Sequence, residues 1–139
     1  MKLILTAVEQ PLADAWTRLC GDLDFVAVHR GSIVDLECDA VVSPANSYGF
    51  MEGGIDALYL DHFGTDIQAR LRRHILDHHH GELVVGHADV IETGHDKIPF
   101  LIAAPTMRVP MNLGETVNPY LAARAVFVLV THGRFSSGT

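Results

Sequence analysis

The chain has 139 residues, of which 48% are hydrophobic, so it can bury one sizeable core, and we expect a single domain over residues 1–139. Its formal charge of -7 and its pI near 5.6 create a field that repels polyanions, which argues against nucleic acid as a partner. Because no apolar run is long enough for a signal peptide or a membrane span, we expect a cytoplasmic protein with no membrane partner.

The first part of the chain predicts two strands joined by a helix. Leu3 to Val8 and Phe25 to His29 are apolar runs of the length and composition typical of strands. Between them, Gln10-Pro11 places a proline in the first turn of a helix, where its missing N–H costs little. The helix is expected to end at Gly21.

A third strand is predicted at Ala40 to Val42, and it should end at Ser43-Pro44. Proline cannot donate a hydrogen bond to a central ladder, so the strand stops there. Ala45 and Asn46 are then placed at the carboxyl edge of the strand, where open α/β sheets usually bind ligands.

Glycines dominate the loop that follows this strand. Gly49, Gly53 and Gly54 can take a positive φ and let a ligand approach the backbone closely, since they have no Cβ. The next apolar residues fall at helical spacing: Ile55, Leu58, Tyr59 and Phe63. The adjacent glycines therefore lie at a helix N-terminus, where free N–H groups and the helix dipole favour an anion such as a phosphate.

The second half of the chain predicts two more helices and two more strands. Thr65 to Gln68 has the form of a capping box, and the helix that it starts should stop near Gly81. Leu83 to Val90 and Phe100 to Ala104 are expected to be antiparallel neighbours in a mixed sheet. The last helix starts at Asn118-Pro119, and its predicted buried face is Leu121, Ala125, Val128 and Leu129.

The chain ends in a polar loop from Arg134 to Thr139. A crossover helix normally buries its face by returning to the sheet through a further strand, and none follows here. We therefore expect a domain that is incomplete at its C-terminus.

The segment from Asp39 to Asp56 resembles the macro domain, the family that binds ADP-ribose. In that family a strand, an asparagine and a glycine-rich loop lead into Gly-Gly-Val/Ile-Asp, and here Asn46 and Gly53 to Asp56 occupy those places. The resemblance implies an α/β fold, a three-layer α/β/α sandwich with a mixed β-sheet. It also implies ADP-ribose or an ADP-ribosylated protein as the ligand, with no cofactor. The family's last strand, second phosphate loop and final helix have no counterpart in this sequence.

The resemblance assigns a role to each candidate site residue. Asn46 would orient the distal ribose, and the backbone from Gly53 to Ile55 would hold the diphosphate, with Ala45 beside them. In hydrolase members the aspartate matching Asp56 helps to activate the attacking water. Ser32-Ile33 matches a turn whose usual aspartate accepts a bond from the adenine amino group, which the Ser32 hydroxyl can also do.

Structural interpretations of the same residues stay open. Asn46 could bond its own backbone two residues on, as turn asparagines often do, and Asp56 could simply stabilise the first turn of its helix. The sequence therefore leaves three candidate functions: an ADP-ribosyl hydrolase, a non-catalytic ADP-ribose-binding module, and a scaffold with a vestigial pocket.

Histidines gather near the end of the predicted helix that stops at Gly81. His74 and His78 lie four residues apart, and His79 and His80 follow. No third ligand recurs at a useful spacing, and imidazoles complement the dipole at a helix C-terminus, so we expect no metal.

Overall fold

The computed structural model describes residues 1–44 and 46–133. The chain divides into two compact units, Met1–Glu37 and Cys38–Thr139, and each is described by itself. The single-domain organisation stays a prediction. The predicted role of Ala45 and the predicted loop from Arg134 to Thr139 lie outside the described residues.

The first unit is a parallel β–α–β arrangement. Strands β1 (Leu3–Ala7) and β2 (Val26–Arg30) pair in parallel, and helix α1 (Gln10–Cys20) connects them, with its proline in the first turn as predicted. A short 3-10 helix, η1 (Ile33–Asp35), follows β2. Parallel neighbours need such a crossover, and a helix is the usual one.

The second unit contains a three-stranded mixed sheet in the order β3-β5-β4. The central strand β5 (Phe100–Ala103) runs parallel to β3 (Ala40–Ser43) and antiparallel to β4 (Asp89–Glu92). The predicted antiparallel pair is thus confirmed, but its first strand begins at Asp89 rather than at Leu83. The amide of Leu83 donates to the carbonyl of Ser47 at 2.8 Å, so the chain there follows a loop instead of a ladder.

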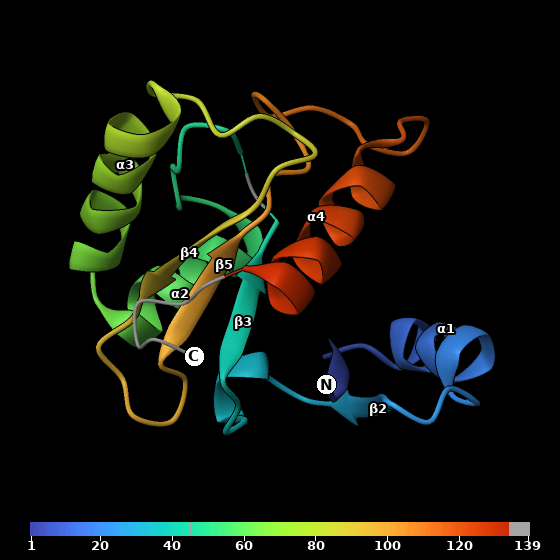
Figure 1. Cartoon of the computed structure of the whole chain (residues 1–139). Helices are drawn as coiled ribbons and strands as arrows, with labels where there is room; N and C mark the ends of the chain where they lie inside the picture. Colours follow the sequence, from blue (N-terminus) through green and yellow to red (C-terminus); the bar gives the residue numbers. More distant parts are fainter. Residues whose placement is uncertain (45, 134–139) are drawn as a thin grey trace. The chain divides into compact units, whose positions relative to one another are not determined.

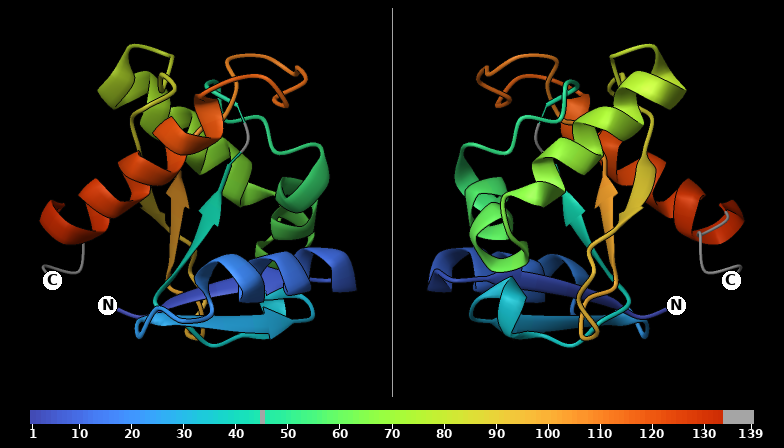
Figure 2. Two further views of the ribbon diagram at one scale, coloured as in Figure 1. Left: turned by 90° about the vertical axis from the view of Figure 1, so that its right-hand side faces the viewer. Right: turned by 90° about the vertical axis from the view of Figure 1, so that its left-hand side faces the viewer.

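Three helices accompany this sheet: α2 (Gly54–Phe63), α3 (Asp66–His79) and α4 (Asn118–His132). Figures 1 and 2 show α3 and α4 on opposite sides of the sheet, which confirms the predicted α/β sandwich. None of the helices within residues 1–44 and 46–133 has the length and apolar character needed to cross a membrane.

The buried faces of α3 and α4 differ in how well the sequence predicts them. In α3, Ile67, Leu71 and Ile75 are all buried, as their spacing indicates. In α4 the fully buried residues are Ala122 and Ala125, whereas Val128 is 44% exposed. The prediction that Val128 is buried is therefore wrong, and that for Ala125 is confirmed, while Leu121 and Leu129 are half-buried.

The predicted capping box at the start of α3 is also wrong. Thr65 is itself in the right-handed helical conformation, with φ -64° and ψ -21°, and its side chain makes no capping bond. The Gln68 side chain turns away from the helix start, and its Oε1 accepts a hydrogen bond of 2.7 Å from the amide of Met51. Gln68 thus fastens the glycine-rich loop to α3.

This arrangement predicts that substitutions of Thr65 and Gln68 lower the free energy of unfolding by different amounts. Thr65→Ala should change the free energy of unfolding by less than about 0.5 kcal/mol, since Thr65 is exposed and caps nothing. Gln68→Ala should cost about 1–3 kcal/mol, because it leaves the Met51 amide without its acceptor. Urea unfolding of both variants checks this, and equal losses would contradict it.

Candidate ligand-binding site

Two loops leave the sheet together at the carboxyl ends of β3 and β5. The ends of the strands, Ser43 and Ala103, are in register, and the Thr106 amide and hydroxyl both donate to the carbonyl of Pro44, at 3.2 and 2.5 Å. Further on, Asn46 and Met107 form an isolated parallel bridge. The predicted placement of Asn46 beyond the carboxyl edge of a buried strand is confirmed.

The adjacent glycines Gly53 and Gly54 lie at the start of α2, where the sequence places them. Gly53 is the N-cap residue, with φ -142°, and Gly54 has a positive φ of 58°. Both are exposed, and a Cβ built on either would meet no atom within 4 Å. Within the part of the chain that the structure describes, neither amide has a hydrogen-bond acceptor. The start of α2 therefore presents open donors at the positive end of the helix dipole.

Asn46 uses its side chain to close the loop on itself. Its Oδ1 accepts hydrogen bonds from the amides of Tyr48 and Phe50 at 3.1 and 3.3 Å, and its Nδ2 donates to the Phe50 carbonyl at 2.9 Å. This is the turn role that the sequence left open. The predicted contact of Asn46 with a ribose stays a prediction, because these three bonds already use both polar atoms of its side chain.

Asp56 points into the protein rather than into solvent. The residue is only 1% exposed, and its Oδ1 accepts a 2.5 Å hydrogen bond from the Ser43 hydroxyl at the end of β3. Its Oδ2 has no partner among the described residues. No sequence pattern pointed to Ser43 as a partner, because the two residues meet only when α2 packs beside β3.

Burial sets the ionisation of Asp56. Loss of solvent raises the pKa of its carboxyl to about 6, although the hydrogen bond from Ser43 opposes this shift. A carboxyl that titrates near neutral pH suits general acid–base chemistry. Its burial, however, keeps it from direct contact with bulk solvent.

A second buried group lies one helical turn from Asp56. The Tyr59 hydroxyl donates a 2.9 Å hydrogen bond to the carbonyl of Val42, and its side chain is fully buried. Burial raises the pKa of Tyr59, and the nearby Asp56 raises it further. The helix that carries the open amides is thus anchored to β3 by two hydrogen bonds.

The remaining predicted site residues have separate positions. Ile55 is half-buried in the first turn of α2. Ser32 and Ile33 belong to the first unit, where Ser32 is the extended N-cap residue of η1. The ligand-binding roles of these residues stay predictions.

Solved structures that superpose on this chain decide its fold. A macrodomain of Oryza sativa APL in complex with ADP-ribose matches at a TM-score of 0.63 and 12% identity, over 91% of this chain and 75% of that one. A macrodomain mutant of Oceanobacillus iheyensis matches at a TM-score of 0.61 and 19% identity, over 73% and 55%. The macrodomain of Mycobacterium tuberculosis DarG matches at a TM-score of 0.59 and 16% identity, over 94% and 70%.

This chain has the macrodomain fold. No protein-family model matches the sequence of this chain. An uncharacterized protein of Aquifex aeolicus (strain VF5) is 33% identical to it over 104 residues, or 75% of this chain. The matched region covers 59% of the length of that relative.

Proposed function

We propose that this macrodomain binds ADP-ribose, either free or attached to a protein, and that the diphosphate lies at the start of α2. The observation that carries the proposal is the pair of exposed amides of Gly53 and Gly54, which no acceptor in the described protein occupies. Successive free amides at a helix N-terminus are suited to a phosphate. The Oryza sativa macrodomain, which shares the fold, was solved in complex with ADP-ribose.

The position of Asp56 favours binding over hydrolysis. An aspartate that activates water must reach that water, and Asp56 is buried against Ser43. The alternative is an enzyme that hydrolyses the bond between the distal ribose and a protein or acyl group. That alternative predicts that the protein releases ADP-ribose from a modified protein. It also predicts that an Asp56→Ala variant still binds the modified protein but hydrolyses the bond much more slowly. A scaffold with a vestigial pocket would show no rise in melting temperature with any excess of ADP-ribose.

Substitutions at Gly53 test where the diphosphate binds. Gly53→Asp and Gly53→Asn should both fold, because φ is -142° there, the added atoms have space, and both residues are favoured at an N-cap. Asp and Asn have nearly the same shape, so the ratio of their affinities reports charge. We expect Gly53→Asp to bind ADP-ribose at least about tenfold more weakly than Gly53→Asn, a difference of about 1.4 kcal/mol.

Isothermal titration calorimetry of the whole chain measures both variants, with AMP as a ligand that lacks the diphosphate and the distal ribose. Equal affinities for the two variants would show that the diphosphate does not bind at the start of α2, although the protein would still bind ADP-ribose. No saturable heat with the unmodified protein would overturn the proposed function itself.

A further inference from the structure

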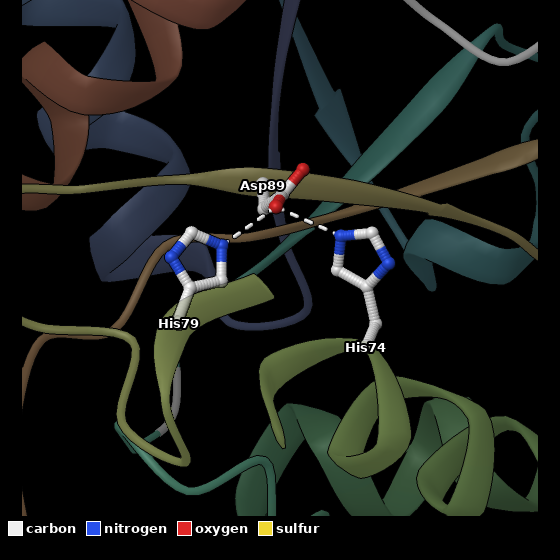
Figure 3. Close-up of side chains that lie close together, drawn as sticks. All are labelled: His74, His79 and Asp89. Carbon is white, nitrogen blue, oxygen red and sulfur yellow. Dashed lines mark hydrogen bonds and ion pairs between the residues drawn. The ribbon is translucent and has the colours of Figure 1, made fainter. Parts of the chain in front are cut away.

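We infer that His74, His79 and Asp89 form a binding site for one zinc ion between the end of α3 and the start of β4. One ligand atom from each of these residues lies within 4.8 Å of the others. Figure 3 shows the two imidazoles of α3 pointing at the same carboxylate oxygen of Asp89. The site combines two imidazoles and one carboxylate, a donor set that Zn²⁺ commonly takes.

The two histidine–aspartate distances are close to those that a metal would impose. The Nε2 atoms of His74 and His79 lie 2.8 and 2.7 Å from Asp89 Oδ2. Ligand atoms bound tetrahedrally at about 2.0–2.1 Å lie roughly 3.3 Å apart, so each histidine–aspartate pair needs to open by only about 0.6 Å. The three side chains are all half-buried, with exposed fractions of 27% for His74, 23% for His79 and 26% for Asp89.

The carboxylate of Asp89 is already oriented for this role. Its Oδ1 accepts a 2.8 Å hydrogen bond from the amide of Val90, which leaves Oδ2 directed at the two rings. A hydrogen bond to the second oxygen of a metal-binding carboxylate fixes its direction and raises metal affinity. Without a metal, each neutral imidazole can donate from its Nε2–H to Asp89. With Zn²⁺ bound through Nε2, the proton of each neutral ring lies on Nδ1 instead.

The sequence led us to expect no metal because it offered no third ligand near the histidines. Asp89 is that third group, and it lies 10 residues beyond His79, across the loop that joins α3 to β4. The pair that helical spacing singles out, His74 and His78, is a competing site. Their ring centroids lie 4.4 Å apart, but His78 is exposed and has no recorded bond to Asp89 within residues 46–133.

Three variants separate the proposed site from this competitor. His79→Gln keeps a side-chain donor for Asp89 but removes the metal ligand, and Asp89→Asn keeps the shape but removes the charge. His78→Ala is the matched control, since it removes the competing helical ligand. Zinc chloride is titrated into each protein by calorimetry in a buffer that does not chelate metals, and circular dichroism establishes that each variant is folded.

We expect one zinc per unmodified chain, an affinity at least about 100-fold lower for His79→Gln and Asp89→Asn, and little change for His78→Ala. Saturating zinc should also raise the melting temperature of the unmodified protein and of His78→Ala. The inference is overturned if the unmodified protein binds no zinc, if His79→Gln binds as tightly as it does, or if His78→Ala loses the binding. His79→Gln carries the test alone should Asp89→Asn not fold.

Discussion

Replacement of Asp56 by asparagine should remove a large part of the pH dependence of stability. The folded pKa of Asp56 is about 6, above the 3.8 of an unperturbed aspartate, because burial disfavours its charge. Between these two values the native state holds a proton that the unfolded state releases. Stability of the unmodified protein therefore falls as the pH rises through this window, and the loss levels off near about pH 7, above the folded pKa.

The size of the effect follows from the two pKa values. A shift of about two pKa units corresponds to about 3 kcal/mol, and most of it falls between about pH 4 and pH 7. The asparagine side chain cannot ionise, so the Asp56→Asn protein lacks this loss. We expect its free energy of unfolding, relative to the unmodified protein, to rise by about 2–3 kcal/mol over that range. Urea denaturation at closely spaced pH values measures that difference directly.

The change of this stability difference with pH is the quantity to compare, because the effect of placing an amide beside Ser43 is the same at every pH. Asp61→Asn is the matched control, because Asp61 is on the same helix but exposed, and it corrects for the loss of one negative charge. If the stability difference between Asp56→Asn and the unmodified protein stays flat across the whole window, Asp56 is not held in this buried site. The preference for binding over hydrolysis, which rests on that burial, would fall with it.

The order of the elements was predictable because local patterns specify them. The glycine pair and the helical spacing after it located α2, and the spacing of Ile67, Leu71 and Ile75 located the buried face of α3. The ends of strands were less well predicted where a backbone amide bonds to a distant loop instead of to a neighbouring strand. The Leu83 amide donates to Ser47, so β4 starts only at Asp89.

Side-chain partners were predictable only where they are local. The turn role of Asn46 was visible as an alternative, since its partners Tyr48 and Phe50 follow closely in the chain. The Ser43 partner of Asp56 and the Asp89 partner of the histidines lie 10 to 15 residues away, on other elements. Such pairs arise from how helices pack on the sheet, which no periodicity in the sequence encodes.

Gly49→Ala should be strongly destabilising, by roughly 2–5 kcal/mol. Gly49 has a φ of 78°, and a left-handed conformation costs a residue with a side chain about 1–2 kcal/mol. A Cβ there would also lie 3.0 Å from Ile75 Cδ1 and 3.2 Å from the side chains of Leu71 and Arg72. Because Ile75 and Leu71 are buried in α3, they can move little, and overpacking of this kind adds about 1–3 kcal/mol.

Gly54→Ala separates the two causes, because Gly54 also has a positive φ, 58°, but open space around its Cβ. Its free energy of unfolding should fall only by the cost of the left-handed backbone conformation, about 1–2 kcal/mol. Chemical unfolding of both variants gives the comparison, and the excess loss in Gly49→Ala measures the contact between the loop and α3. If the two variants lose the same amount of stability, Gly49 does not press on α3, and the hydrogen bonds of Gln68, Asp56 and Tyr59 hold the loop and α2 in place instead.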